Sequence, residues 1–244
     1  MSLSGNRNIV IVGVGSLMSK SFAIWLAILG WNIALVSRSE KDLSAIADEV
    51  RRAQKGKDVS VIYQAVDASE PSILKAMLDW CVRELGCKLD VLSYNAARVA
   101  MTDIAKTAPE ELEKDFRASA VGTMVASQWF AEGNSRVDRI AEGEWPLFLV
   151  TGGILDKEPQ PTFGSLSCAK AASQTVSRIF AKVLPDKANI LVGMPLVAGR
   201  VVSPMSEEYH PRARQRRHRR HHPQALLIAY ERFMHLHFHG AYFK

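Results

Sequence analysis

Residues 8–19 read NIVIVGVGSLMS, and this stretch decides the fold. The apolar, β-branched run 9–12 is typical of a strand that is buried on both faces. Gly13 and Gly15 follow directly, and residues 20–29 then carry apolar side chains at helical spacing up to Gly30, a residue typical of helix C-termini. A strand, a glycine turn and a helix bring the free N–H groups of a helix N-terminus to a place where a diphosphate binds.

The turn after this strand is therefore a predicted cofactor site. Its predicted binding residues are Gly13, Gly15, Ser16, Leu17 and Met18. The GxGxxG pattern is incomplete, because Met18 stands where the third glycine belongs. A strand-to-helix turn that binds nothing remains the alternative at this point.

Length and composition favour a single α/β domain over residues 1–244. We expect no secretory signal, because glycine, serine and lysine interrupt the N-terminal apolar stretch, and no segment of the sequence is apolar enough to cross a membrane. The three cysteines are odd in number and lack zinc-type spacing. The sequence thus predicts reduced thiols, a cytoplasmic location, no metal site and no membrane partner.

The net charge of +6 comes from one segment. Six arginines lie between His210 and His222 with no acidic residue among them. Without these six, 25 of the 31 Lys and Arg residues remain, equal to the 25 acidic residues. We predict an Arg/His-rich loop at 204–223 within the domain, with 210–222 as a disordered surface run, and an amphipathic helix at 223–239. Because no aromatic residues interleave the arginines, a nucleic-acid partner is not favoured.

The second predicted strand, residues 31–37, ends in Ser37 and Arg38. Dinucleotide folds place the residue that contacts the adenine ribose at this strand end, where an acid selects NAD. Here the acid is absent and a guanidinium follows, which suits a 2′-phosphate and predicts NADP(H). A solvated surface arginine is the alternative. Asp67, at the end of the next predicted strand, is assigned either to the adenine amino group or to a cap of the helix that begins at Pro71.

The rest of the chain alternates between strands and helices. Further strands are predicted at 59–66, 89–94, 147–151 and 189–194, and helices at 39–55, 71–85, 118–132 and 164–184. Thr107 and Glu110 have the spacing of a capping box at the start of another helix. Loops are predicted at 133–143 and 152–162. This alternation predicts an α/β fold with a doubly wound parallel sheet flanked by helices, followed by a C-terminal helix.

From residue 6 to about residue 202 the chain resembles the short-chain dehydrogenase/reductase family. The resemblance is carried by the Gly13 turn, Ser37-Arg38, Asp67, Asn95-Ala96, the run TAPEE at 107–111 and the run SCAKAA at 167–172. It implies a Rossmann fold that binds NADP(H), with Asn95, Ala96, Lys170 and Pro195 at the cofactor. It also implies a small-molecule substrate and a homodimer or homotetramer paired through the helices at 118–132 and 164–184.

The chain departs from this family at the catalytic positions. The family tyrosine, four residues before Lys170, corresponds to Leu166. The family serine falls near Gly153, with Thr151 two positions away, and the family asparagine corresponds to Ser119. Of the catalytic residues, the resemblance therefore retains only Lys170, as a candidate ligand of the nicotinamide ribose. A surface lysine on a helix is the alternative for this residue.

The missing hydroxyls restrict the chemistry. Reduction of a carbonyl creates an alkoxide, which needs a proton and hydrogen-bond donors, and losing such donors costs on the order of 10²–10⁴ in rate each. A protonated imine carries its own charge, and hydride addition neutralises that charge. Two classes of function remain: an NADPH-dependent reductase of an activated C=N bond, and a non-catalytic NADP(H)-binding sensor or scaffold.

The loop after the fifth predicted strand supplies one carboxylate, Asp156, as a catalytic candidate. A solvated loop residue paired with Lys157 is the alternative. The predicted substrate pocket comprises Gly153, Ile154, Leu155, Phe163 and Leu166. Within the family, the glycine turn, the missing hydroxyls and this loop most resemble the fungal bifunctional imine reductase/Diels–Alderases of bridged diazaoctane indole alkaloid biosynthesis. That resemblance implies reduction of an iminium followed by a cycloaddition in the same pocket, because enforced proximity supplies much of such a barrier.

Overall fold

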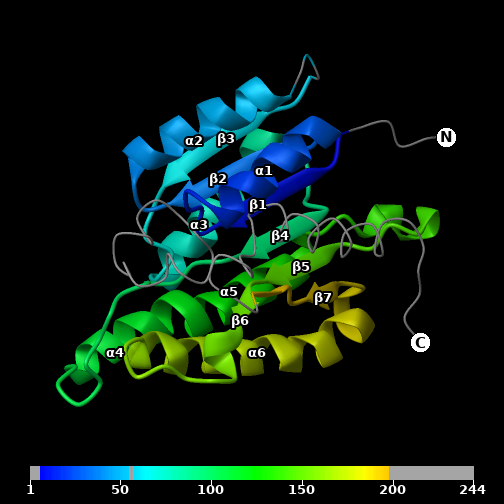
Figure 1. Ribbon diagram of the computed structural model, residues 1–244. Helices are drawn as coiled ribbons and strands as arrows, with labels where there is room; N and C mark the ends of the chain where they lie inside the picture. Colours follow the sequence, from blue (N-terminus) through cyan, green and yellow to red (C-terminus); the bar gives the residue numbers. More distant parts are fainter. Residues whose placement is uncertain (1–5, 55, 57, 198–244) are drawn as a thin grey trace, which may run out of the picture.

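The computed structural model describes residues 6–197, except residues 55 and 57 (Figure 1). The predicted Arg/His-rich loop at 204–223, with its run 210–222, and the predicted amphipathic helix at 223–239 lie outside the described residues. Within the described part, a central sheet is covered by helices on both faces (Figure 1).

Six parallel strands form this sheet in the order β3-β2-β1-β4-β5-β7. Their bounds are β1 (Asn8–Val12), β2 (Asn32–Ser37), β3 (Val61–Ala65), β4 (Val91–Tyr94), β5 (Leu147–Val150) and β7 (Leu191–Gly193). Every residue of β1 is buried, as the apolar run 9–12 predicts for a central strand. The order and the parallel pairing confirm the predicted doubly wound α/β fold.

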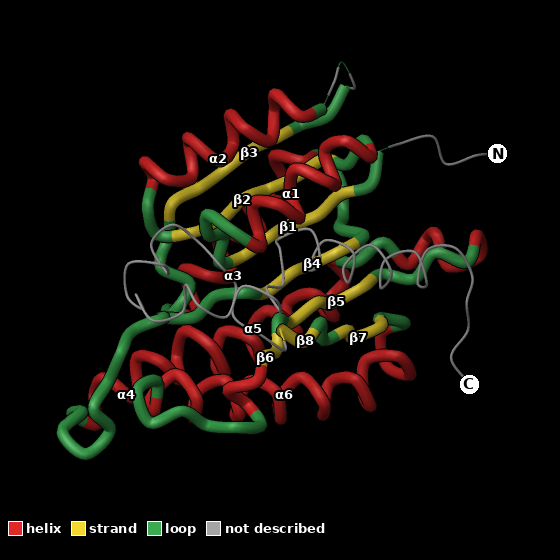
Figure 2. Tube along the Cα trace, in the orientation of Figure 1, coloured by secondary structure: helices red, strands yellow, loops and turns green. Residues whose placement is uncertain are grey.

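Helices cover both faces of the sheet (Figure 2). Their bounds are α1 (Met18–Leu29), α2 (Glu40–Ala53), α3 (Pro71–Leu85), α4 (Pro109–Phe116), α5 (Gly122–Trp129) and α6 (Gly164–Ala188). On one face α1 and α2 pack in a cluster that includes Phe22 and Leu43. On the other face α3, α5 and α6 contribute Leu78, Trp129 and Leu184 to a second cluster.

Several predicted helix ends agree with the structure. Gly30 ends α1 in the left-handed conformation with φ 90°, and its N–H donates to the Ala27 carbonyl at 3.0 Å. Ser39 caps α2 by accepting a hydrogen bond from the Asp42 N–H at 3.3 Å. By contrast, α6 continues to Ala188, past its predicted end at 184, with Pro185 inside the helix.

Two predicted caps are wrong. Thr107 does not cap α4, whose N-cap residue is Ala108; instead the Thr107 hydroxyl donates to the Asp103 carbonyl at 2.8 Å. Asp67 does not cap α3, whose N-cap residue is Glu70; its carboxylate accepts the Ser69 N–H at 3.0 Å. In both cases a local turn takes the side chain that the sequence pattern assigned to the helix.

The helix predicted at 118–132 is the second half of a longer one. α4 continues without a break through a π-helical turn, η1 (Arg117–Val121), into α5, because residues 116–122 keep helical backbone angles. A second π-helical segment, η2 (Phe130–Asn134), ends this helix at Gly133, which has φ 95°. Wide π turns of this kind are often found at functional sites, and η1 carries Ser119.

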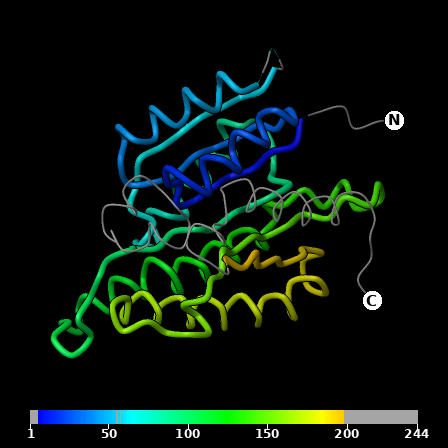
Figure 3. Tube along the Cα trace, viewed as in Figure 1, coloured from blue at the N-terminus to red at the C-terminus, as the bar shows by residue number. Residues whose placement is uncertain are grey.

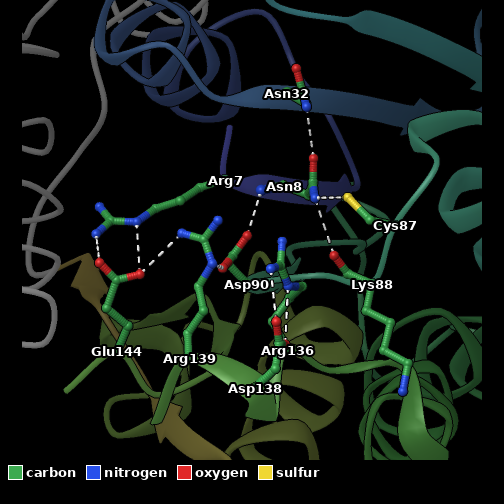
Figure 4. A network of polar contacts seen from close by, with 10 residues as sticks. All are labelled: Arg7, Asn8, Asn32, Cys87, Lys88, Asp90, Arg136, Asp138, Arg139 and Glu144. Atoms are coloured by element: carbon green, nitrogen blue, oxygen red, sulfur yellow. Dashed lines mark hydrogen bonds and ion pairs between the residues drawn. The ribbon is translucent and has the colours of Figure 1, made fainter. Parts of the chain in front are cut away.

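The loop predicted at 133–143 contains a 3₁₀ helix, η3 (Val137–Glu142), that is fastened to the sheet. Its Arg139 is 5% exposed; Nε lies 3.6 Å from Asp90 Oδ1 and Nη1 donates to Glu144 at 3.2 Å. Asp90 also accepts the Asn8 N–H at 2.7 Å, and Arg7 pairs with Glu144 (Figure 4). Burial raises the pKa of the Asp90 carboxyl. This network links η3 to the residues at the amino-terminal ends of β1 and β4.

The loop predicted at 152–162 also contains regular structure. A short strand, β6 (Gly152–Gly153), pairs in parallel with β8 (Leu196–Val197) and leads into the 3₁₀ turn η4 (Ile154–Asp156). This pairing brings the segment after β5 beside the segment after β7. Among the described residues, no helix has both the length and the apolar character needed to span a bilayer.

Candidate cofactor and substrate site

A cavity of about 640 Å³ lies at the carboxyl ends of the strands. The chain fills one side of the sheet with β2 and β3 and then crosses to β4, so the strand order reverses between β1 and β4 (Figure 3). Ligands bind at this switch point in doubly wound sheets, and the volume lies within the range of roughly 300–1,000 Å³ of small-molecule sites. The predicted residues that line the cavity are Gly13, Gly15, Ser16, Leu17, Met18, Ser37, Arg38, Asp67, Asn95, Ala96, Gly153, Ile154, Leu155, Leu166 and Lys170.

The two glycines of the first turn have different roles. Gly13 has φ 87°, and a Cβ at this position would lie 2.4 Å from the Ala96 nitrogen, so no side chain fits there. Its N–H donates to the Val36 carbonyl at 2.8 Å, which ties the turn to β2. A Cβ on Gly15, by contrast, would meet no atom within 4 Å. Gly15 therefore leaves the backbone open toward the cavity.

The N-terminus of α1 lies at this turn, and neither a side-chain cap nor an acidic residue offsets the positive end of its helix dipole. The N-cap residue Leu17 provides no side-chain cap, and the first helical turn contains no acidic residue. The first N–H groups of the helix are therefore available to an anion. The arrangement fits the diphosphate of a dinucleotide.

Asn95 joins the turn after β4 to the turn after β1. Its Nδ2 donates to Ser19 Oγ at 2.9 Å and to the Gly13 carbonyl at 3.3 Å. Ser19 is 6% exposed and was not predicted as a site residue. Its signal in the sequence is a small polar residue at an inward-facing position between Gly15 and Phe22.

The far end of the cavity, beyond β2 and β3, is polar. Ser37, Arg38 and Asp67 line it, and the side chains of Arg38 and Asp67 are exposed. Within the described part of the chain, the Arg38 guanidinium makes no hydrogen bond or ion pair. It is free to contact a ligand there.

Lys170 and Leu166 lie one turn apart on α6 and both line the cavity. The Lys170 Nζ donates to the Thr151 carbonyl at 3.0 Å. Burial lowers the pKa of Lys170 to about 8, and the Asp156 carboxylate opposes this shift. Leu166 is 4% exposed, so its position offers an apolar wall to the cavity.

Asp156 follows the lining residues 153–155 in the chain but does not itself line the cavity. Its Oδ2 accepts the Gly153 N–H at 3.4 Å, while its Oδ1 is buried without a hydrogen-bond partner among the described residues. Its charge acts on Lys170, although Asp156 is not itself a lining residue. The loop thus places one carboxylate next to the lysine.

The geometry of this cavity agrees with what the chain resembles among known proteins. The family model of short chain dehydrogenases matches residues 7–212. The chain belongs to the short-chain dehydrogenase family.

Two relatives in this family are reductases. A very-long-chain 3-oxoacyl-CoA reductase of Aspergillus oryzae is 26% identical over 180 residues, which are 72% of this chain and 49% of that protein. An NADPH-dependent aldehyde reductase-like protein, chloroplastic, of Arabidopsis thaliana is 26% identical over 186 residues, 73% of this chain and 67% of that protein. The match therefore spans about half the length of the Aspergillus relative.

Solved short-chain dehydrogenase structures share the fold. An alcohol dehydrogenase from the archaeon Thermococcus sibiricus, complexed with 5-hydroxy-NADP, superposes with a TM-score of 0.74 at 18% identity, covering 94% of this chain and 91% of its own. An NADH-dependent reductase A1-R′, complexed with NAD, also gives 0.74 at 18% identity, covering 92% and 87%. At these identities the likeness establishes the Rossmann-type architecture.

Three predicted site residues do not line the cavity. Phe163 forms a bridge with Thr102 at the start of α6, and Pro195 is buried where its carbonyl accepts the Gly152 N–H at 3.1 Å. Asp156 is the third. Ser119, which corresponds to the family asparagine, is 1% exposed, and its Oγ has no hydrogen-bond partner among the described residues. Its neighbour Ala118 lines the cavity instead.

The structure also adds lining residues that the sequence did not reveal. These are Ser19, Arg98, Val99, Ala118, Thr151 and Val197, together with residues next to the predicted ones. Thr151 lines the cavity and provides the carbonyl that accepts the hydrogen bond from Lys170. Among the described residues that line the cavity, there is no tyrosine or histidine.

Proposed function

We propose that this short-chain dehydrogenase is an NADPH-dependent reductase of an activated C=N bond. The open backbone at Gly15 and the free N-terminus of α1 would hold the diphosphate. Lys170 and Asn95 would hold the nicotinamide half at the opposite end of the cavity. When bound, NADPH would supply a hydride to the carbon of a protonated imine, which gives a neutral amine and NADP⁺.

The preference for NADPH rests on the adenine end of the cavity. Ser37 provides no carboxylate to bind a ribose 2′-OH, and Arg38 provides an exposed guanidinium beside it. Guanidinium groups bind phosphate through paired, charge-assisted hydrogen bonds. Asp67, also exposed at this end, would accept a hydrogen bond from the adenine amino group.

One observation carries the choice of substrate: Leu166 lines the cavity where the family places its proton-donating tyrosine, one turn before Lys170. An alkoxide formed there would have no phenol to protonate it. An iminium needs no such donor, because hydride addition removes its charge. We therefore place an activated imine, rather than a ketone, against Leu166, Ile154 and Leu155.

Lys170 and Asp156 are the proposed catalytic residues. Lys170 positions the cofactor through its buried ammonium, anchored on the Thr151 carbonyl. Asp156 supplies a negative charge next to this lysine and would stabilise a cationic substrate or exchange a proton with it. In the same apolar pocket a second, cyclising step of the [4+2] type would gain from enforced proximity, as in fungal indole alkaloid biosynthesis.

A non-catalytic NADP(H)-binding sensor or scaffold is the second candidate. It is favoured by the same observation, because the described cavity keeps the features that bind a dinucleotide but presents Leu166 in place of a proton donor. The two relatives named above carry reductase names, which favours the enzyme.

The apolar residues Val121, Met124 and Ile179 are 38%, 45% and 57% exposed on η1, α5 and α6, which supports pairing of subunits through these helices.

The test is oxidation of NADPH by the purified protein with two matched substrates. We expect turnover with 3,4-dihydroisoquinoline, a cyclic imine, and none with the ketone 1-tetralone, which has a similar ring system. Tight NADPH binding without turnover of any imine in a panel would favour the sensor or scaffold. Efficient reduction of 1-tetralone would contradict both proposals.

A further inference from the structure

Arg98 is a cation on the wall of the cavity that the proposed reaction does not use. It follows Asn95, Ala96 and Ala97 after β4, so it lies on the opposite side of the switch point from Arg38. Its side chain is 26% exposed. A cation at a ligand cavity would ordinarily suggest an anionic ligand, but the neighbours of this guanidinium point elsewhere.

All three guanidinium nitrogens of Arg98 are engaged by α4. Nε lies 2.6 Å from Asp115 Oδ1 and Nη2 lies 3.3 Å from Asp115 Oδ2, which makes a bidentate pair. Nη1 lies 2.7 Å from Glu111 Oε2, and Nη2 also donates to the Glu111 carbonyl at 3.3 Å. Two carboxylates therefore outnumber the single positive charge, and four of its five N–H donors are used.

The partner carboxylate is itself fixed. The Asp115 side chain is 2% exposed, and its Oδ2 accepts a hydrogen bond from the Ser165 hydroxyl. Ser165 is fully buried in the first turn of α6, one residue before Leu166, and its N–H donates to Thr102 Oγ1 at 3.4 Å. Arg98 is thus held by α4, whose Asp115 is in turn fixed by α6.

With its nitrogens occupied in this way, the parts of Arg98 that are left for a ligand are the flat face of the guanidinium and the methylene stem. The cavity is also lined by the apolar residues Val99, Ala118, Leu155 and Leu166. We propose that Arg98 is a specificity-determining residue that stacks on an aromatic ring of the substrate. The face of a guanidinium is attracted to an aromatic ring by cation–π and stacking interactions, and pre-organisation reduces the entropy lost on binding.

This inference rests on the proposed substrate site and narrows its substrate class to imines that carry an aromatic ring. An anionic ligand is disfavoured because both carboxylates stand directly behind Arg98. A purely aliphatic ring would fill the same apolar space but would gain nothing from the guanidinium face.

The test compares two amines of the same skeleton and charge by calorimetry. 1,2,3,4-Tetrahydroisoquinoline contains an aromatic ring, and decahydroisoquinoline is its saturated counterpart. With wild-type protein and NADP⁺, we expect the aromatic amine to bind roughly three- to twenty-fold more tightly. Equal affinities, or tighter binding of the saturated amine, would overturn the inference without any mutant.

Variants then locate the effect. Arg98→Lys keeps a cation for Asp115 but removes the planar face, so the preference should fall to about one-fold while NADP⁺ affinity stays unchanged. Arg117→Lys is the control, because Arg117 is exposed, lies 3.5 Å from Glu70 and does not line the cavity. If Arg98→Lys does not fold, the double variant Arg98→Met/Asp115→Asn removes both charges together and leaves no buried carboxylate unpaired. An unchanged preference in either folded variant overturns the inference.

The readouts separate this inference from the reductase proposal. Amine binding needs no turnover and is measured both with and without NADP⁺. A ring preference that Arg98→Lys abolishes supports the inference even where no imine is reduced, and in that case the reductase proposal alone fails. Imine turnover with no ring preference would leave the reductase standing and would overturn the role of Arg98.

Discussion

Replacing Lys170 with methionine should stabilise the protein near neutral pH while weakening its binding of NADPH. Burial lowers the pKa of this lysine to about 8 from its usual value of 10.5. At pH 7 the folded protein therefore carries a buried ammonium whose charge is less well solvated than in the unfolded chain. Methionine has a similar length and no charge, so it removes this cost.

The size of the effect follows from the pKa difference. At about 1.4 kcal/mol for each pH unit, the lowered pKa corresponds to a cost of about 3 kcal/mol to the folded state. The variant loses the hydrogen bond from Nζ to the Thr151 carbonyl, and this loss lowers its stability by about 1–2 kcal/mol. We therefore expect Lys170→Met to raise the free energy of unfolding by about 1–2 kcal/mol at pH 7.

The pH dependence gives the sharper signature. Between pH 8 and pH 10.5 the unfolded chain binds a proton at Lys170 that the folded protein has released, so wild-type stability rises with pH in this window. The variant lacks this contribution. The gap in favour of Lys170→Met should therefore shrink between pH 8 and pH 10.5, whereas groups common to both proteins cancel in the difference.

Urea unfolding at pH 7, 9 and 10 measures this gap, with Lys182→Met as the control because Lys182 is exposed on the same helix. The control should match the wild type at each pH. A variant that is less stable than the wild type at pH 7, with a gap that does not change with pH, would refute the reasoning about the buried ammonium.

Four further predictions follow from the geometry. Arg38→Ala should weaken NADPH binding roughly ten- to hundred-fold and leave NADH binding unchanged, as calorimetry would show, because a charge-assisted contact to the 2′-phosphate contributes about 1.5–3 kcal/mol. Asp156→Asn should lower imine turnover roughly 10²-fold without changing NADPH affinity. Gly13→Ala should unfold the turn, whereas Gly15→Ala should keep thermal stability and weaken NADPH binding, because only the first Cβ meets backbone atoms. Arg139→Met should cost about 3–5 kcal/mol in urea unfolding, because it leaves the buried Asp90 carboxylate without its ion-pair partner, whereas Glu144 keeps Arg7.

Controls and contrary outcomes are specific to each change. Equal affinity of the wild type for both cofactors would contradict the role of Arg38. Glu158→Gln, on the exposed part of the same loop, should turn over normally, and wild-type turnover of Asp156→Asn would show that the Asp156 carboxylate takes no part in the reaction. A well-folded Gly13→Ala protein would contradict the contact with Ala96. An Arg139→Met protein as stable as the wild type would show that the network contributes little.

The sequence predicted the parts of the fold that local pattern determines. The strand 9–12, the glycine turn and Gly30 were correct because burial, turn geometry and helix termination are each encoded within a few residues. The capping box at Thr107 was wrong because α4 begins at Pro109 with Ala108 as its N-cap residue, so Thr107 lies one residue too early and its hydroxyl donates to the Asp103 carbonyl in a local turn. Patterns of spacing do not weigh such local competition.

The lining of the cavity was predictable at the glycine turn and at the ends of β1 and β2, and less so beside α4. Gly13, Arg38 and Lys170 belong to motifs whose order along the chain is informative. Arg98 was missed because its role depends on Asp115, on a neighbouring helix, and on Ser165, which is fifty residues further along. Contacts between distant segments leave no periodic signal in a single sequence, and that is why the wall formed by α4 and α6 had to be seen in the structure.

The central position of β1 has a consequence for how the chain folds. Its pairing with β2 closes a short stretch, since Val12 meets Val36, but its pairing with β4 joins Ile9 to Val91. Closing the longer loop costs more conformational entropy, and only the contacts that β4 makes with β1 offset this cost. We therefore expect the first βαβ unit to form before β4 pairs with β1. The contact between Asn8 and Asp90 forms across the same long interval and buries a carboxylate as it does so. The cavity lies at this junction, so it needs the long-range pairing of β1 with β4 as well as the local pairing of β1 with β2.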